Sequence, residues 1–425
     1  MSNKNRSSDE KFLENLIITD GIPYSPGNIP TGHFVLDFVI HYGEDPTNIN
    51  LHDLEDYDPC VPLGLPLGKV VEFFGGEGGG KSSLAYRVAG NCQKLGYTAA
   101  WIDAEASFST NLARINGCDA ESIIRISTSE NDMYAEMVLD TMISLCKCEK
   151  VPRKKDGQIV YVDSPKVIIV DSVASLIPKV VEEKDSEQTQ VGVLARILSQ
   201  NLGKVVSAAE KNGVLVIFIN QLREKIGLFF GNPETSPGGN ALKHFCSTRL
   251  KITKRKSKDS IINKIDDFGD EVMIGRYSYV NIEKNRFGKP YLSSIDIPIY
   301  YEDYFPSIEE ILFDTGRQLQ IISVRKGVYK WEDVKIEGKN NFIEEIKNKN
   351  LTKKLSLFLE EKAIENGALV PPEISIFNKK NIEKKNIMKE ESSNEMDGSI
   401  SREGKGEDSD SLSDKPKKRG RKKSS

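Results

Sequence analysis

The sequence lacks the features that would place it in a membrane or a secretory pathway. No apolar run is long enough to cross a bilayer, and Met1 to Arg6 lead into charged residues instead of an apolar signal core. Cysteine is sparse, with 6 in 425 residues, and Cys146-Lys147-Cys148 has no second pair at zinc-finger spacing. We therefore expect a cytoplasmic protein with reduced thiols and no membrane partner. Disulfides or a thiolate metal site are the less favoured alternative.

Composition divides the chain into four regions. They are an N-terminal segment with an acidic insertion (1–61), an α/β core (62–302), a small C-terminal domain (303–368) and a tail (369–425). The first region has a short amphipathic pattern at 10–17 and an acidic, turn-rich stretch at 44–61. The tail is nearly all polar, so we expect it to be disordered, and it ends in a basic run at 415–423. The formal net charge of −4 decides little, because local charge matters more.

The core alternates apolar runs with helical patterns. Six runs are predicted strands: 69–74, 98–102, 166–171, 214–220, 248–254 and 277–285. Because strands alternate with helices, the pattern predicts an α/β fold with a doubly wound, mostly parallel sheet. Ligands bind such sheets outside the carboxyl ends of the strands, so the residues that end these runs are the candidates for chemistry.

A glycine-rich segment after the first run fits the phosphate-binding pattern G-x-x-x-x-G-K-[ST]. Strand, loop and helix follow in the required order, which favours a nucleotide site over a glycine-rich turn with an accidental lysine. Glycines let backbone N–H groups surround a triphosphate, and the start of the helix adds positive potential. The predicted nucleotide contacts are Gly75, Gly76, Glu77, Gly78, Gly79, Gly80, Lys81, Ser82 and Ser83.

A carboxylate follows another apolar run at a position that suits a metal ion. The run 166–171 ends in Asp171, which with the hydroxyl of Ser82 predicts a Mg²⁺ site beside the nucleotide. A helix-capping aspartate is the alternative. We prefer the metal role because the phosphate loop is present in the same sequence.

Two other strand ends supply a candidate base and a candidate sensor. The run 98–102 is followed by Asp103 and Glu105, of which Glu105 is the candidate general base and Asp103 the weaker alternative. The run 214–220 is followed by Gln221. A neutral amide there can respond to the γ-phosphate without adding negative charge.

The order of these motifs resembles the bacterial RecA recombinase family. The segment from Trp101 to Glu105 is similar to its catalytic glutamate strand, and 170–176 to its Walker B segment. The most specific part, 218–243, is similar to its sensor strand followed by its second DNA-binding loop. The resemblance runs from about Ile29 to residue 302. It implies a RecA-type P-loop NTPase core, a small α+β C-terminal domain, and ATP with Mg²⁺.

The resemblance also implies two DNA-binding loops. The second, 222–240, is rich in Gly, Asn and Pro yet carries apolar side chains such as Phe229, which suit wedging against bases. Without the family match, a loop folded onto the core would be preferred. The first candidate loop, 182–192, is acidic and precedes the helix that contains Arg196. By the resemblance, Val191 takes the base-wedge position and Arg196 contacts the DNA backbone. The implied DNA contacts are Val191, Arg196, Arg223, Lys225, Ile226, Phe230, Gly238, Gly239 and Asn240.

Other positions follow or depart from the family. Lys284-Asn285-Arg286 resembles the basic pair that reaches a neighbouring subunit's ATP, so the implied catalytic set is Lys81, Glu105, Gln221, Lys284 and Arg286. Leu112 replaces the tyrosine that stacks on adenine, and Tyr300 is the candidate for the remaining base contact. Extra segments at 44–61 and 147–165 are typical of a specialised relative such as a phage-encoded one. The basic end favours non-specific DNA attraction, and a solubilising tail is the alternative.

The resemblance implies a DNA-dependent ATPase that forms a filament on single-stranded DNA. It would catalyse pairing and strand exchange with homologous duplex DNA in recombination and repair. A head-to-tail homo-oligomer with ATP between subunits generates such open filaments. One alternative is a RecA-like hexameric DNA motor or helicase, against which the second DNA loop and the Lys-Asn-Arg pair argue. Another is a RecA paralogue that binds DNA without exchanging strands, against which the intact nucleotide motifs argue.

Overall fold

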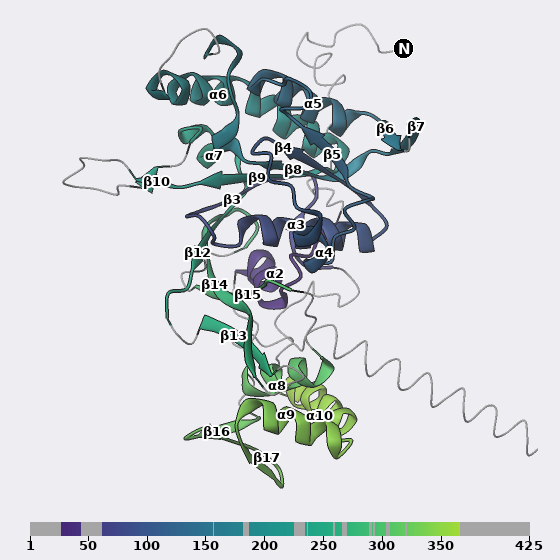
Figure 1. The fold of residues 1–425 in the computed structure, drawn as a ribbon, viewed down its shortest axis with the longest axis vertical. Helices are drawn as coiled ribbons and strands as arrows, with labels where there is room; N and C mark the ends of the chain where they lie inside the picture. The colour runs from purple at the N-terminus through teal and green to yellow at the C-terminus, as the bar shows by residue number, and fades with distance from the viewer. Residues whose placement is uncertain are drawn as a thin grey trace, which may run out of the picture.

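The computed structural model describes most of the chain between residues 27 and 365. The described ranges are 27–43, 62–155, 157–181, 187–224, 234–235, 237–257, 260–265, 270–288, 291, 294–302, 307–318 and 321–365. The amphipathic pattern at 10–17, the acidic stretch at 44–61 and the tail at 369–425 lie outside these ranges. Within them, the protein is an α/β structure whose large sheet has helices on both faces (Figure 1).

A nine-stranded sheet forms the centre of the described core (Figure 1). Its order is β13-β14-β12-β3-β9-β8-β4-β5, with β15 paired to β14. The strands are β3 (Val70–Gly75), β4 (Thr98–Asp103), β5 (Ile124–Ser127), β8 (Pro165–Asp171), β9 (Leu215–Gln221), β12 (Thr248–Lys254), β13 (Ile261–Ile265), β14 (Glu271–Asn285) and β15 (Ile295–Tyr300). Neighbouring strands from β12 to β5 are parallel, whereas β14 is antiparallel to each of its partners.

Helices cover both faces of the parallel strands, which explains why most residues of those strands are apolar. Alternation along β3 sends Val71 and Phe73 to one layer and Val70 to the other. The first layer holds α2 (Phe34–Tyr42), α3 (Lys81–Lys94) and α4 (Thr110–Ile115); the second holds α5 (Ala135–Lys147), α6 (Glu187–Asn212) and α7 (Asn240–Phe245) (Figure 1). Two 3₁₀ turns, η2 (Val173–Ser175) and η3 (Lys179–Val181), follow β8. None of the described helices is both long and apolar enough to cross a membrane.

The sequence prediction of the parallel core is confirmed. Five predicted runs match β3, β4, β8, β9 and β12 within one residue, and the sixth covers the second half of β14. The strands β5, β13 and β15 were not predicted. Two of them have a physical reason: β5 has only four residues and includes Arg125, and β15 contains Pro298.

Short strands outside the main sheet form pairs of their own. The strands β6 (Lys150–Lys155) and β7 (Gln158–Asp163) make an antiparallel hairpin in the region predicted to be an insertion, 147–165. Gly157, with φ of +79°, lies at its turn, where glycine tolerates the left-handed conformation. The other two pairs are β1 (Asn28–Ile29) with β2 (Leu65–Pro66), and β10 (Arg223–Glu224) with β11 (Glu234–Thr235).

The C-terminal part of the described chain has a separate hydrophobic core, in which Phe313, Trp331 and Phe342 are buried. Its elements are α8 (Ile308–Gln318), β16 (Ser323–Arg325), β17 (Val328–Trp331), β18 (Val334–Glu337), α9 (Lys339–Asn348) and α10 (Thr352–Glu365). They gather at the end of the molecule away from α5 and α6 (Figure 1). A separate core supports a small α+β domain, while the boundaries at 302 and 368 stay predictions.

Candidate nucleotide and DNA site

The glycine-rich loop joins β3 to α3, as its sequence predicts. Gly80, just before the first helical residue Lys81, has φ of +97°, a conformation that favours glycine. A Cβ at Gly75 or Gly79 would lie 2.0 or 2.7 Å from the carbonyl oxygen of Ile252 on β12. Glycine therefore lets the loop lie directly against β12. The first N–H groups of α3 have no partner within the helix, which makes this end an anion site.

Lys81 lies back over its own loop. Its Nζ donates to the carbonyl oxygens of Gly75 at 3.1 Å and Gly76 at 2.8 Å. Burial lowers the pKa of Lys81, and nearby carboxylates, chiefly that of Asp171, act in the opposite direction. The ammonium group is thus held at the loop by two weak acceptors, which a phosphate oxygen can replace.

Ser82 and Asp171 meet across the end of the sheet. The Ser82 Oγ donates to the Asp171 Oδ2 at 2.9 Å. Burial raises the pKa of Asp171 to about 6, and the hydrogen bond from Ser82 lowers it. Mg²⁺ in nucleotide sites takes one or two protein ligands and completes its shell with phosphates and water. A hydroxyl and one carboxylate at this spacing fit that requirement. No cluster of three or more His, Cys, Asp or Glu side chains that could hold a metal occurs in the described part.

The candidate base and the candidate sensor are in direct contact. Gln221 Nε2 donates to Glu105 Oε1 at 3.0 Å. The backbone N–H of Glu105 and that of Ala104 donate to the carbonyl oxygen of Asp171, at 3.1 and 2.7 Å. The ends of β4, β8 and β9 therefore bring Glu105, Asp171 and Gln221 together, at the edge of the sheet where a parallel fold binds ligands.

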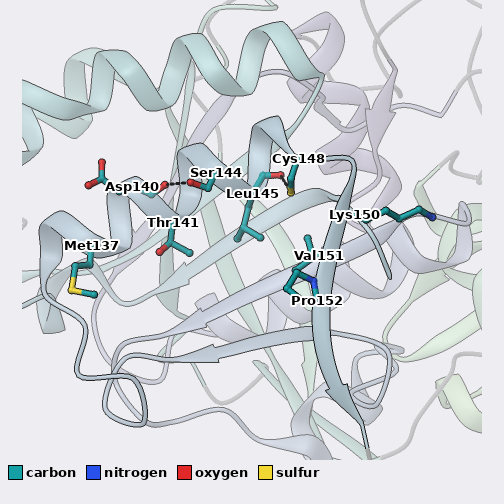
Figure 2. Close-up of a pocket in the computed structure, with 9 residues that line it drawn as sticks. All are labelled: Met137, Asp140, Thr141, Ser144, Leu145, Cys148, Lys150, Val151 and Pro152. Carbon is teal, nitrogen blue, oxygen red and sulfur yellow. Dashed lines mark hydrogen bonds between the residues drawn. The ribbon is translucent and has the colours of Figure 1, made fainter. Parts of the chain in front are cut away.

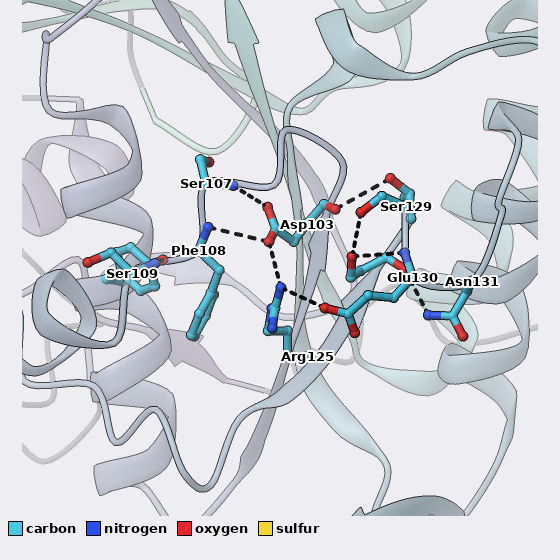
Figure 3. A network of polar contacts seen from close by, with 11 residues as sticks. Asp103, Ser107, Phe108, Ser109, Arg125, Ser129, Glu130 and Asn131 are labelled. Atoms are coloured by element: carbon cyan, nitrogen blue, oxygen red, sulfur yellow. Dashed lines mark hydrogen bonds and ion pairs between the residues drawn. The ribbon is translucent and has the colours of Figure 1, made fainter.

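Asp103 has a different task from Glu105 (Figure 3). Its buried carboxylate accepts the backbone N–H of Ser107 at 2.9 Å and of Phe108 at 3.3 Å. It also accepts from the Arg125 guanidinium at 3.3 Å, which in turn contacts Glu130 at 3.4 Å. Because these donors occupy both carboxylate oxygens, Asp103 fixes the loop that carries Glu105, and the geometry favours Glu105 as the base.

Aromatic side chains below the same loop were not identified from the sequence. Tyr86 on α3 stacks on Trp101 with ring centroids 4.1 Å apart, and Phe108 meets both rings edge-on. The Tyr86 hydroxyl accepts the backbone N–H of Ser109 at 3.0 Å. This cluster ties the Glu105 loop to the helix that begins at Lys81. The available signal was one aromatic residue in the helix after the phosphate loop, one in the strand before Glu105 and one just after Glu105.

Lys284 and Arg286 do not meet the phosphate loop of the same chain. Lys284 lies in register with Arg249 on β12, which lies in register with Glu72 on β3. Glu72 lies three residues, or about 10 Å, before Gly75 on β3. Lys284 is displaced from Glu72 by a further two strand spacings, about 10 Å across the sheet. Its Nζ instead donates to the carbonyl oxygens at the end of α7, those of Lys243 at 2.7 Å and His244 at 3.1 Å. Arg286 donates to the His244 carbonyl at 3.2 Å.

Tyr300 ends β15 and is half-buried. Burial raises its pKa, as does the nearby Tyr277, whereas Arg87 on α3 lowers it. The preceding residue, Ile299, is the one against the phosphate loop, because a Cβ on Gly80 would lie 2.7 Å from its Cδ1. Tyr301, just past the end of β15, is 44 % exposed. The base contact at Tyr300 stays a prediction.

The two candidate DNA segments converge on α6. Arg196 is exposed on α6. The prediction of a loop at 182–192 is wrong for residues 187–192, Val191 included, because α6 already begins at Glu187. A Cβ on Gly238 would lie 2.7 Å from Leu198, and one on Gly239 would lie 3.0 Å from Ala195. Asn240 begins α7 and Arg223 lies in β10, whereas Lys225, Ile226 and Phe230 are outside the described residues. The DNA contacts themselves stay predictions.

A hollow elsewhere on the molecule has no part in this arrangement. It is a cavity of about 450 Å³ between α5 and the β6 strand of the hairpin, with Leu145, Val151 and Pro152 among its lining residues (Figure 2). None of the predicted nucleotide or DNA residues lines it.

Comparison with known proteins gives consistent matches. The family model of the RecA N-terminal domain matches residues 60–305. Protein RecA of Bifidobacterium breve is 35 % identical over 294 residues, which cover 69 % of this chain and 62 % of that protein. Protein RecA of Cytophaga hutchinsonii is 36 % identical over 273 residues, 64 % of this chain and 69 % of the relative. Protein RecA of Symbiobacterium thermophilum is 33 % identical over 316 residues, which cover 74 % of this chain and 76 % of that protein. The matched part thus spans somewhat less than two thirds of the Bifidobacterium relative.

Proposed function

Because this chain belongs to the RecA family, we propose that it is an ATP-dependent DNA recombinase that acts in recombination and repair. In this proposal it is a DNA-dependent ATPase that forms a head-to-tail filament on single-stranded DNA. It pairs that strand with homologous duplex DNA and exchanges strands. The observation that carries the proposal is the contact between Gln221 and Glu105, because Gln221 ends the strand that leads directly into the candidate DNA segment.

The phosphate end of ATP would lie along the loop from Gly75 to Ser82. Backbone N–H groups at the start of α3 bind its oxygens, and Lys81 exchanges the carbonyls of Gly75 and Gly76 for the β- and γ-phosphates. Ser82 and Asp171 would hold Mg²⁺, which would supply positive charge beside the phosphates. The raised pKa of Asp171 fits this role, since a buried carboxylate without a cation favours its protonated form.

Glu105 would accept the proton of the attacking water. Its contact with Gln221 occupies the carboxylate before ATP binds. A γ-phosphate offers the Gln221 amide a more highly charged acceptor, so nucleotide binding would draw the amide away and free Glu105 for water. The same step moves the end of β9, and with it the start of the DNA segment.

Lys284 and Arg286 would act on the nucleotide of a neighbouring subunit. Their distance from the phosphate loop in one chain supports this assignment, and the α7 carbonyls that hold them lie at a helix C-terminus, which favours cations. A contact that runs from one face of a subunit to a different face of the next is heterologous, and it produces an open filament when the rotation does not close.

One pair of measurements tests the proposed function. ATP hydrolysis should rise on addition of single-stranded DNA, and electron microscopy with ATP and that DNA should show filaments. Rings would support a hexameric motor, and DNA binding without strand exchange in a fluorescent-strand assay would support a non-exchanging paralogue. Either result would contradict the recombinase proposal.

A further inference from the structure

A buried series of hydrogen bonds connects the phosphate-loop strand to the point where the DNA segment returns to the core. Glu72 on β3 and Asn220 on β9 are both fully buried. Asn220 Nδ2 donates to Glu72 Oε1 at 2.9 Å and to the carbonyl oxygen of Pro237 at 3.0 Å. Pro237 directly precedes Gly238 and Gly239. One amide nitrogen therefore ties both ends of the segment between 220 and 237 to β3.

Asn220 has no polar atom left over. Its Oδ1 accepts the backbone N–H of Gln221 at 3.0 Å, so the side chain also fixes the residue that contacts Glu105. Both amide hydrogens are used, one on Glu72 and one on Pro237. A side chain that is saturated in this way cannot follow a movement of Pro237 without changing its other contacts.

Arg249 balances the charge of Glu72. Its Nε donates to Glu72 Oε2 at 2.6 Å, and its guanidinium lies 4.2 Å from the ring centroid of Phe74. A buried carboxylate persists only when it is paired and hydrogen-bonded, which this contact achieves. The ion pair alone would join β3 to β12. The hydrogen bond from Asn220 to Pro237 does not contribute to the charge balance. Its effect is to hold the end of the candidate DNA segment at Pro237 against β9.

We propose that Asn220, held by Glu72, is a positioning residue that couples occupancy of the DNA segment to the nucleotide site, an inference that rests on the proposed function. When DNA displaces the segment, Pro237 withdraws its acceptor and Asn220 reorients on Glu72. The Gln221 backbone then shifts, and its side chain changes its contact with Glu105. The link runs in both directions, since coupling between two binding sites is reciprocal.

The first test compares two asparagines whose side-chain amides each donate to a proline carbonyl. Asn220→Ala removes the bond to Pro237 together with those to Glu72 and to the Gln221 N–H. The matched control Asn91→Ala removes a part-buried amide bond from α3 to the carbonyl of Pro30, also 3.0 Å long. We expect the stimulation of ATP hydrolysis by single-stranded DNA to fall about tenfold in Asn220→Ala, within the range by which one position changes coupling. The KM for ATP without DNA should change less than twofold. Asn91→Ala should keep the wild-type stimulation.

A second variant separates coupling from stability. The double exchange Glu72→Gln with Asn220→Asp restores a hydrogen bond between positions 72 and 220 with reversed polarity. The new carboxylate at position 220 cannot donate to the Pro237 carbonyl. We therefore expect the double variant to be more stable to urea than either single exchange, while the stimulation by DNA stays low. This variant also serves if Asn220→Ala does not fold.

Trypsin provides a readout that needs neither ATP nor DNA. Arg223 and Lys225 are cleavage sites within the segment that Pro237 closes. Asn220→Ala and the double variant should be cut there faster than wild type and than Asn91→Ala. If single-stranded DNA stimulates ATP hydrolysis as strongly in Asn220→Ala or in the double variant as in wild type, the coupling through Asn220 is overturned. The proposed function would be unaffected by that result. An absence of DNA stimulation in the wild-type protein would overturn the proposed function, and the coupling with it.

Discussion

Gln221 and Glu105 are joined by a hydrogen bond of 3.0 Å, although 116 positions separate them in the chain. The contact forms because β9 and β4 flank β8 in the sheet and end at the same edge. It links the residue that precedes the candidate DNA segment to the candidate base. In the proposed function, nucleotide and DNA would therefore act on one pair of side chains, and replacement of either residue should affect the response to both ligands.

Replacement of Glu105 by Gln should retain nucleotide binding and slow turnover. The amide keeps the size of the side chain but cannot accept a proton from water, and loss of a general base costs about a hundredfold or more. Steady-state hydrolysis and binding of a fluorescent ATP analogue measure the two effects. The control is Glu210→Gln, which changes an exposed carboxylate paired with Lys69. Wild-type turnover in Glu105→Gln would show that another group is the base.

Replacement of Lys81 by Ala should abolish hydrolysis. No other residue between Gly75 and Ser82 carries a cation that can reach the phosphates. The control is Lys94→Ala at the other end of α3, where the lysine donates to Asn91 Oδ1 at 3.3 Å. Hydrolysis that persists in Lys81→Ala at more than a few per cent would mean that a cation from outside the loop binds the phosphates.

Replacement of Asp103 by Asn should reduce both stability and turnover. The new amide places a donor against the donors of Phe108 and Arg125, so one buried group loses its partner. Such a loss costs about 1–3 kcal/mol, measurable by urea unfolding. The kcat should fall more than the KM for ATP changes, because the loop that loosens carries Glu105. Asp119→Asn, at a surface turn, is the control. An unchanged kcat would restrict Asp103 to a structural role.

Local patterns identified most of the residues that the structure brings together at the candidate site, whereas the long-range contacts between them could not be predicted. The spacing of the residues from Gly75 to Ser82 was enough to predict a loop between a strand and a helix. Asp171 and Gln221 were found because they end apolar runs. The function of Asp103 depends instead on Arg125, which reaches it from another strand. Nothing in the sequence around either residue indicates their pairing.

The link between Asn220 and Glu72 was beyond sequence reasoning for a related reason. Glu72 interrupts an apolar run, which only indicates that a charge is present. Its partners lie 148 and 177 positions away, and the parallel register of three strands brings them together. Register depends on the whole sheet, so a single segment carries no signal for it.

Stability should fall as the pH rises from 6.5 to 8. Burial raises the pKa of Asp37 from 3.8 to about 8, despite a hydrogen bond from the Thr31 N–H at 2.7 Å. The folded state therefore binds more protons than the unfolded state between these values, and stability is lost as the pH rises through them. One pKa unit corresponds to about 1.4 kcal/mol, so the fall over this interval is at most about 2 kcal/mol. His33, whose pKa burial lowers to about 4, has its effect below pH 6.5.

Urea unfolding of wild type and Asp37→Asn at pH 6.5 and 8 measures this effect. The variant keeps an acceptor for the Thr31 N–H but does not titrate, so the pH dependence should be weaker than in wild type. The charge of Asp37 also acts on the buried Arg87. Equal pH dependence in the two proteins would mean that this guanidinium keeps Asp37 ionised in the folded state.

Two inactive variants should restore activity when they are mixed. Lys81→Ala destroys the phosphate loop of its own subunit, whereas Lys284→Ala removes the cation offered to a neighbour. In a head-to-tail filament each site combines the loop of one subunit with Lys284 of the next. A site made from the loop of a Lys284→Ala subunit and the cation of a Lys81→Ala subunit has both groups. Random mixing in equal amounts should give such sites at about a quarter of the interfaces.

Hydrolysis by the mixture, in the presence of single-stranded DNA, should therefore reach about a quarter of the wild-type rate, although each variant alone is nearly inactive. The control is a mixture of Lys81→Ala with Glu105→Gln. If Glu105 acts within the same subunit as Lys81, no combination of these two variants assembles a complete site, and the mixture stays inactive. Recovery only with Lys284→Ala would place Lys284 opposite the loop of a neighbour. A mixture with Lys284→Ala that shows no recovery would contradict the shared site, because a lysine acting on its own subunit's nucleotide cannot be supplied by another chain.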